Sequence, residues 1–274
     1  MTYAEITAIL TNAGVDSPAY DAAELIAHFC SSSTADLHLM PAQDYASPAL
    51  AEAVRRRAAR EPLQYILGEW SFWRQTYRVA EGCLIPRADT ELLVEYAIKH
   101  LPQGAHFLDL CTGSGCIAVS TLASRPDCTA DAIDAFPVPL ALAAENARRN
   151  GVAERLCVRQ GDVLAGEGAI GAYAAIISNP PYIVRDVLGT LAPELAHEPQ
   201  TALDGGADGL IFYRAILDRY RGALSDGGCF ILEIGYDQAE ALRALAAERN
   251  LTCDIYRDLG GCDRMAILHE AHTA

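Results

Sequence analysis

The stretch Asp109-Leu110-Cys111-Thr112-Gly113-Ser114-Gly115-Cys116 decides the fold of this 274-residue chain. It follows an apolar run typical of a buried strand, and a helical pattern begins at its end. A glycine-rich turn between a strand and a helix lets the backbone approach a ligand closely and directs amide groups toward it. Cys111 stands where the G-x-G-x-x-G pattern has its first glycine, so we expect the left-handed backbone positions at Gly113 and Gly115.

Strand-like apolar runs and helical patterns alternate from about residue 88 onward. The runs lie at 106–110, 129–134, 156–161, 173–178, 228–234, 252–257 and 264–269. The helical patterns lie at 116–125, 137–150, 208–224 and 237–249. Such alternation predicts crossover units, and therefore a mainly parallel sheet with helices on both faces. Only 258–263 joins the last two runs, so they should pair antiparallel. The predicted fold class is α/β, with a seven-stranded Rossmann-like sheet whose last strand is reversed.

The region before residue 70 shows helical patterns only. Helices are expected at about 2–13, 18–31 and 47–60, and a hairpin at about 72–86. We therefore predict three parts in chain order: a small all-helical N-terminal domain, a β-hairpin linker and the α/β domain, over 1–70, 71–87 and 88–274.

The charge balance bears on the choice of partner. Acidic side chains outnumber basic ones by 36 to 21, which gives a formal net charge of −15. Because duplex-binding proteins neutralise phosphates with Lys and Arg, nucleic acid is a disfavoured partner. The arginines at 55–57 and 60 are expected on a solvated helix face. No apolar run is long enough to span a bilayer and no signal-peptide pattern begins the chain, so we expect no membrane partner and a cytoplasmic location.

Cysteine and histidine spacing gives no sign of a metal site. The nine cysteines are scattered without a C-x-x-C pair, and the seven histidines lack H-E-x-x-H spacing. Buried thiols in a reducing compartment are the favoured interpretation, and no metal is predicted.

Acidic residues mark the ends of the next two strand-like runs. Asp134 could accept hydrogen bonds from both ribose hydroxyls of an adenosine-containing ligand, although a strand-end Asp can also cap the next helix. Asp162 could accept from an adenine amino group, and the backbone amide of Val163 could meet the ring. Because the carboxyl ends of parallel strands meet at one edge of a sheet, these residues predict a nucleoside cofactor.

The motif Asn179-Pro180-Pro181-Tyr182 follows the fourth strand-like run. Two successive prolines make a rigid segment whose carbonyls lack neighbouring N–H groups, and Asn179 adds a side-chain carbonyl. A planar NH₂ group could donate one hydrogen to the Asn179 oxygen and the other to the Pro180 carbonyl. Tyr182 could pack on the plane of the incoming amide or base. The motif predicts a site for an amide or amino nitrogen.

These motifs together resemble class I methyltransferases that act on amide or amino nitrogen. Further stretches resemble the bacterial peptide chain release factor glutamine methyltransferases, so that the resemblance covers nearly the whole chain. They are E-P-L-Q-Y-I-L-G at 61–68, L-I-P-R-A-D-T-E at 84–91, Glu198-Pro199, L-D-G-G-A-D-G-L at 203–210, L-E-I-G at 232–235 and D-L-G at 258–260.

The resemblance implies transfer of a methyl group from S-adenosylmethionine to the side-chain amide nitrogen of a glutamine. That glutamine lies in the Gly-Gly-Gln loop of release factors, which act in translation termination. The cofactor contacts implied by the resemblance and by the strand ends are Cys111, Thr112, Gly113, Ser114, Gly115, Asp134, Asp162, Val163 and Asn179. Asn179, Pro180 and Tyr182 are the expected catalytic residues, and these three with Pro181 are expected to bind the target glutamine.

The remaining expectations concern partners and the parts outside the motif. Release factors are the expected protein partner of a monomeric enzyme. The helical domain is expected to dock the substrate, or else to act as a stabilising cap, and the long connection at 183–207 is expected to face the substrate. Arg87 and Glu91 are expected to order the linker hairpin against the catalytic domain.

Three alternatives stay open at this point. A ribosomal protein glutamine is an alternative target, because only the stretch at 84–91 and the N-terminal motifs distinguish that activity. A DNA adenine methyltransferase would share N-P-P-Y but would need a DNA-reading domain and more positive charge. A non-catalytic module would bind cofactor without turnover.

Overall fold

The computed structural model describes residues 1–32, 36–37 and 42–271. The chain forms two compact units. One comprises Met1–Glu69 together with Ala192–His197, and the other comprises Trp70–Leu191 and Glu198–Ala274. A short segment of the long connection after the N-P-P-Y motif therefore belongs to the N-terminal unit.

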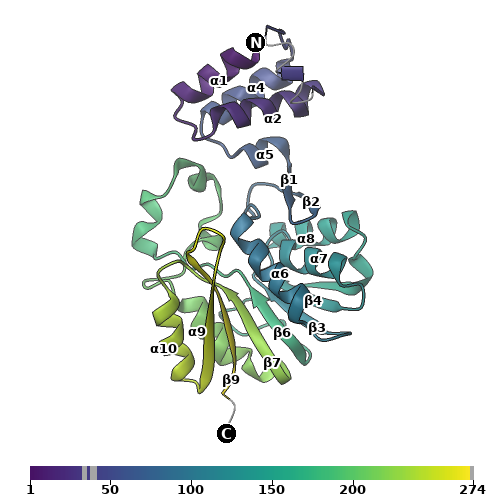
Figure 1. The fold of residues 1–274 in the computed structure, drawn as a ribbon, viewed down its shortest axis with the longest axis vertical. Helices are drawn as coiled ribbons and strands as arrows, with labels where there is room; N and C mark the ends of the chain where they lie inside the picture. The colour runs from purple at the N-terminus through teal and green to yellow at the C-terminus, as the bar shows by residue number, and fades with distance from the viewer. Residues whose placement is uncertain (33–35, 38–41, 272–274) are drawn as a thin grey trace. The chain divides into compact units, whose positions relative to one another are not determined.

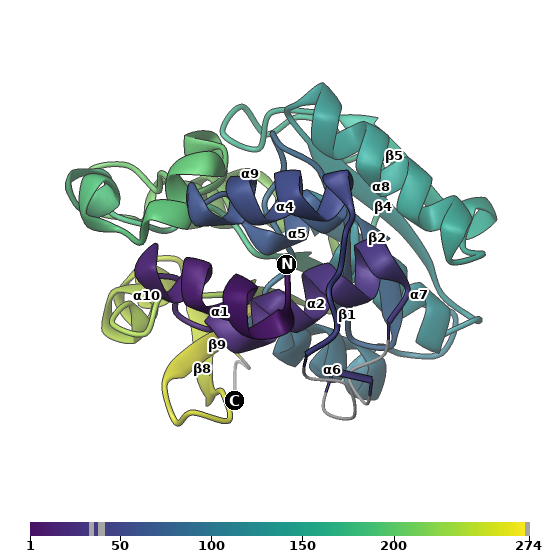
Figure 2. The same cartoon turned by 90° about the horizontal axis from the view of Figure 1, so that it is seen from above.

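The N-terminal unit is helical, as predicted. The helices whose bounds the structure describes in this unit are α1 (Tyr3–Asn12), α2 (Pro18–Cys30), α4 (Pro48–Ala58) and α5 (Leu63–Leu67). Thr2 and Glu5 form a capping box at the start of α1, and Ser47 caps α4 through the amide of Leu50. Figure 2 shows α1 and α2 side by side, and fully buried apolar side chains of these helices form the core of the unit.

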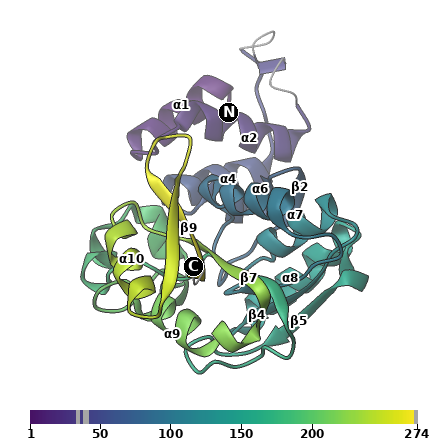
Figure 3. The same cartoon turned by 60° about the horizontal axis from the view of Figure 1, so that its bottom comes forward.

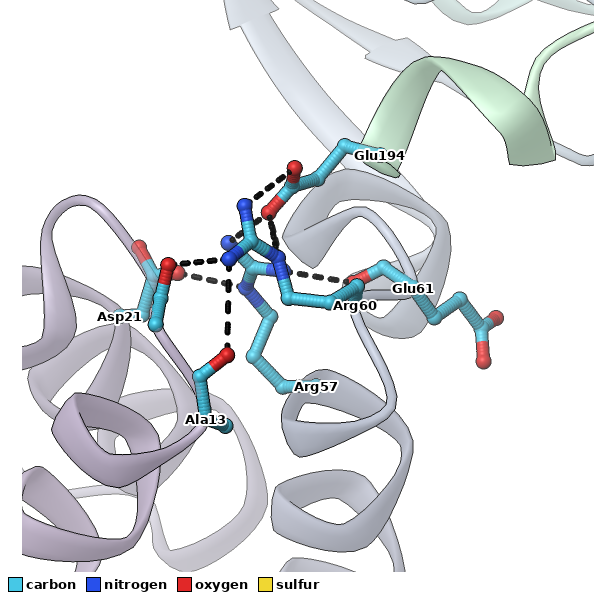
Figure 4. Close-up of polar contacts among 7 residues, drawn as sticks. Ala13, Asp21, Arg57, Arg60, Glu61 and Glu194 are labelled. Carbon is cyan, nitrogen blue, oxygen red and sulfur yellow. Dashed lines mark hydrogen bonds and ion pairs between the residues drawn. The ribbon is translucent and has the colours of Figure 1, made fainter. Parts of the chain in front are cut away.

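Arg57 lies among the polar contacts of the helical unit (Figure 4). Only 6% of the residue is exposed, and its guanidinium donates to Asp21 at 2.6 Å and to the Glu61 carbonyl at 3.2 Å. Arg57 and Arg60 both bind the carboxylate of Glu194, at 3.0 and 2.7 Å. The expectation of a solvated arginine face is therefore wrong for Arg57, because this side chain is buried. A buried guanidinium is stable only when it is paired with several acceptors, and Arg57 has them.

The hairpin consists of β1 (Glu69–Phe72) and β2 (Gln75–Arg78), earlier in the chain than expected. Trp73 turns the chain with a φ of 55°, and its amide donates to Glu91 at 2.6 Å. Glu91 thus orders the hairpin, as predicted.

The large sheet contains seven strands (Figure 1). They are β3 (His106–Leu110), β4 (Thr129–Asp134), β5 (Leu156–Gln160), β6 (Tyr173–Ser178), β7 (Leu224–Glu233), β8 (Leu251–Arg257) and β9 (Asp263–Glu270). Their order is β5-β4-β3-β6-β7-β9-β8, and β9 runs antiparallel to both of its neighbours. The predicted sheet with its reversed last strand is confirmed.

Helices cover both faces of this sheet. Strand residues alternate between the two faces, so Phe107 packs toward α6 (Glu91–His100), α7 (Cys116–Ser124) and α8 (Pro137–Arg149). Leu108 packs toward α9 (Ile211–Arg219) and α10 (Ala239–Ala247), which lie on the other side in Figure 3. Helix α6 was not predicted, although Leu93, Val94 and Ala97 give it a buried stripe. None of the described helices is long and apolar enough to cross a membrane.

The connection from β6 to α9 contains 3₁₀ turns at Arg185–Thr190, Pro193–His197 and Gln200–Ala202, and an isolated β-bridge between Ile183 and Asp204. Its two ends are joined, because the amide of Ile183 donates to Leu203 and the amide of Gly205 donates to Ile183. Gly205 makes this closure possible. A Cβ atom there would lie 2.7 Å from the Cα of Tyr182, closer than real Cβ contacts allow.

We predict that Gly205→Ala lowers the free energy of unfolding by about 1–3 kcal/mol, because the added methyl group overpacks the backbone of Tyr182. Chemical denaturation measures this quantity. Gly189→Ala is the matched control, since Gly189 lies in the same connection with open space around its Cβ position. Equal stability of the two variants would contradict the close contact between Gly205 and the backbone of Tyr182.

Candidate active site

The strand order reverses at β3, where the site lies. β4 and β5 extend the sheet on one side of β3, and β6 pairs with it on the other. In open α/β sheets, ligands bind beyond the carboxyl ends of the strands at such a switch point. Leu110 is the register partner of Ser178, so the glycine-rich turn and the N-P-P-Y motif begin beside each other.

A pocket of about 360 Å³ opens at this edge within the second unit. Of the predicted site residues it is lined by Cys111, Thr112, Gly113, Ser114, Asp134, Asp162, Val163, Asn179 and Pro181. Gly115, Pro180 and Tyr182 are not among its lining residues. Apolar walls that the sequence analysis did not identify come from Ile85, Phe136, Pro139, Leu164 and Phe212.

The glycine-rich turn has left-handed backbone at three positions, with φ of 56° at Cys111, 56° at Gly113 and 81° at Gly115. The expectation for the two glycines is correct, but Cys111 adopts this conformation too, in spite of its Cβ atom. Asp109 holds the turn, because its Oδ2 accepts from the Thr112 hydroxyl at 2.7 Å and the Ala118 amide at 3.2 Å. Burial raises the pKa of Asp109 to about 7.

Asp134 ends β4 and is 8% exposed. Its carboxylate accepts from the Gly113 amide at 3.0 Å and from the Phe136 amide at 3.1 Å, and burial raises its pKa. A carboxylate has about four acceptor positions, so these two bonds leave room for ligand hydroxyls. Asp162 is exposed beside the pocket, where its Oδ1 accepts from the Leu164 amide at 2.8 Å.

The side chain of Asn179 is fixed by a residue outside the N-P-P-Y motif. Its Nδ2 donates to the Thr90 hydroxyl at 3.0 Å, and Thr90 donates to Glu233 at 2.6 Å. Tyr182 donates to the same carboxylate at 3.2 Å and packs against the core on the α9 side of the sheet. Glu233 was not among the predicted site residues. Its position in the L-E-I-G stretch, at the end of a buried strand, was the available signal.

The I-P-R-A-D-T-E stretch is tied to several elements by its polar groups. Glu198, 4% exposed, accepts from the Ile85 amide at 3.0 Å and pairs with Arg87. Arg87 therefore binds the connection after β6 and lines the pocket, in contrast to the hairpin contact that was expected. Asp89 pairs with Arg264 of β9 at 3.3 Å.

The pocket lining includes a polar group that could bind a ligand. No three or more His, Cys, Asp or Glu side chains are arranged to hold a metal ion in the described ranges. The Ser114 hydroxyl is buried without a hydrogen-bond partner among the described residues, and Ser114 lines the pocket. A buried unpaired hydroxyl beside an apolar pocket is a natural contact for a polar ligand group.

Comparison with known families defines the class. Residues 88–216 match the family described as methyltransferase small domain, and residues 2–68 match the PrmC N-terminal domain. The ribosomal protein L11 methylase from Lactobacillus delbrueckii subsp. bulgaricus has a similar fold, with a TM-score of 0.51 and 18% identity over 68% of this chain and 81% of that one. The protein is a methyltransferase.

Curated relatives give the particular family. A release factor glutamine methyltransferase from Caulobacter vibrioides is 36% identical, with 94% of this chain and 91% of that protein covered. The one from Cereibacter sphaeroides is 42% identical, with 93% and 92% covered. The chain belongs to the release factor glutamine methyltransferase family.

Proposed function

We propose that the protein transfers a methyl group from S-adenosylmethionine to the side-chain amide nitrogen of the glutamine in the Gly-Gly-Gln motif of peptide chain release factors. The observation that carries this proposal is the placement of Asn179 at the edge of the pocket, with its NH₂ group bound to Thr90. Because the Asn179 nitrogen is directed at Thr90, the amide oxygen is directed elsewhere, where it can accept from an incoming NH₂ group.

The pocket residues fit the proposed donor. Asp134, Asp162, Val163 and Leu164 all line the pocket. In this proposal Asp134 would accept from ribose hydroxyls, Asp162 would accept from an amino group, and Val163 and Leu164 would contact a base. The turn at 111–115, which has left-handed backbone at three positions, and the unpaired Ser114 hydroxyl would contact the polar groups of the ligand other than its ribose and base. When bound, S-adenosylmethionine would supply the methyl carbon, whose bond to sulfur breaks as its bond to nitrogen forms, and a proton leaves the nitrogen for water.

Asn179 and Pro180 would promote the reaction by orienting the target amide nitrogen. An amide nitrogen is a poor nucleophile because its lone pair is delocalised into the carbonyl. The Asn179 side-chain oxygen and the Pro180 carbonyl would accept the two amide hydrogens and direct the lone pair toward the methyl carbon. Their dipoles also stabilise the positive charge that develops on nitrogen. Orientation can provide effective molarities of ~10⁵–10⁸ M, so no strong base is required.

We predict that methyl label passes from labelled S-adenosylmethionine to a purified release factor. We expect label on the wild-type factor and none on a factor whose Gly-Gly-Gln glutamine is alanine. Equal labelling of both factors would disprove the proposed target. Labelling of a ribosomal protein or of DNA in place of the factor would favour one of the alternatives.

We also predict the effect of Asn179→Ala on catalysis and on cofactor binding. Turnover should fall by about 100-fold or more, because the target nitrogen loses one acceptor and its orientation, while the Kd for S-adenosylmethionine should change by less than about tenfold. Single-turnover kinetics and calorimetric titration give the two quantities. Parallel losses in turnover and cofactor affinity would assign Asn179 to cofactor binding alone.

We further propose that the helical unit docks the release factor. Two of its large apolar side chains are exposed, Ile9 at 39% and Tyr20 at 52%. The segment Ala192–His197 belongs to this unit and is held there by Glu194. Apolar side chains exposed beside polar ones are typical of protein-binding surfaces.

Replacement of Ile9 by Ser together with Tyr20 by Ala should therefore raise the KM for the release factor by about tenfold and leave the Kd for S-adenosylmethionine unchanged. Ile170→Ser is the control, because Ile170 is an exposed apolar residue of the other unit. An unchanged KM in the double variant would refute docking through these side chains.

A further inference from the structure

Glu233 is a buried carboxylate opposite the N-P-P-Y motif. Ser178 and Leu232 are register partners in β6 and β7, so Asn179 and Glu233 follow them side by side. Glu233 is 1% exposed, and its two oxygens accept from different hydroxyls. Oε2 accepts from Thr90 at 2.6 Å, and Oε1 accepts from Tyr182 at 3.2 Å.

The Thr90 hydroxyl determines which way the Asn179 amide faces. A hydroxyl has one hydrogen and two lone pairs. Thr90 gives its hydrogen to Glu233, so toward Asn179 it can only accept. It accepts from the Asn179 Nδ2 at 3.0 Å. The amide oxygen of Asn179 is thereby left for another partner.

The reversed orientation of the amide is disfavoured at both ends. It would bring the Asn179 oxygen against the lone pairs of Thr90, whose hydrogen is committed to Glu233. It would also present an NH₂ group to the NH₂ group of a target amide, and two donors cannot bond each other. Asn179 is half-buried, and a polar group that is shielded from water and left unpaired costs free energy.

We propose that Thr90 and Glu233 are positioning residues, which set the polarity of the Asn179 amide so that its oxygen receives the target NH₂ group. This inference rests on the proposed function, because it assigns the acceptor that a glutamine side chain requires. The residues proposed to take part in the reaction then include Thr90 of the I-P-R-A-D-T-E stretch and Glu233 of the L-E-I-G stretch, in addition to the N-P-P-Y motif.

The surroundings of Glu233 act on its pKa in opposite directions. Burial raises the pKa of Glu233 to about 7, while the Thr90 hydrogen bond, the charge of Arg264 and the Tyr182 hydrogen bond lower it and Asp89 raises it. Arg264 is itself paired with Asp89 at 3.3 Å and Asp258 at 3.2 Å. Above neutral pH the carboxylate form predominates, and a carboxylate can only accept.

The test compares Thr90→Val with Thr90→Ser in methyl transfer to the release factor. Valine has nearly the shape of threonine but neither accepts nor donates, so kcat should fall by about 100-fold. Serine keeps the hydroxyl and should restore kcat to within about threefold of the wild-type value. The Kd for S-adenosylmethionine should stay within about threefold in both variants, although Thr90 lines the pocket. Wild-type kcat in Thr90→Val, or a parallel loss of cofactor affinity, would overturn the proposal.

A double-mutant cycle separates positioning from a general structural role. If Thr90 acts through Asn179, adding Thr90→Val to Asn179→Ala should lower kcat by less than about threefold further. Multiplicative losses would overturn the proposal. Failure of the proposed function is distinct from either result, because it would appear as wild-type protein that does not label the release factor.

Discussion

The carboxylate of Glu233 is buried at the end of β7, and its need for hydrogen-bond donors organises the site around it. A desolvated carboxylate is costly unless each oxygen is bonded. The donors come from Thr90 and Tyr182, which lie far from Glu233 in the chain. Satisfying one carboxylate therefore brings the segment before α6 and the N-P-P-Y motif against the same strand end, and Asn179 joins them through Thr90.

A second constraint acts on the connection between β6 and α9. Its 3₁₀ turns contain no buried residues, so apolar burial cannot set their path. Ion pairs and hydrogen bonds of two carboxylates hold the connection instead. Glu198 binds the Ile85 amide and Arg87 beside the pocket, and Glu194 binds the arginines of the helical unit. Backbone contact at Gly205 closes the base of the connection, where no side chain fits.

One strained backbone position lies where a ligand is expected. Cys111 has a φ of 56°, a conformation that disfavours any residue with a Cβ atom, and it lies between β3 and the glycine-rich turn. The Thr112 amide donates to the carbonyl of Ile133 in the next strand, and Asp109 holds the Thr112 hydroxyl. These bonds explain how the turn keeps its shape without glycine at that position.

The sequence by itself determined most of the strand and helix pattern and the reversed last strand, and it identified the polar residues at the strand ends that line the pocket, because period, turn residues and strand ends are local properties. It did not reveal α6, whose helical stripe is short, nor the burial of Arg57, which follows from Asp21 and Glu194 being brought to it from other segments. Only the tertiary structure decided that Thr90, Asn179 and Glu233 meet. Their contact depends on the pairing of β6 with β7 and on the fold of the segment before α6, and residues so distant in the chain leave no joint pattern in its sequence.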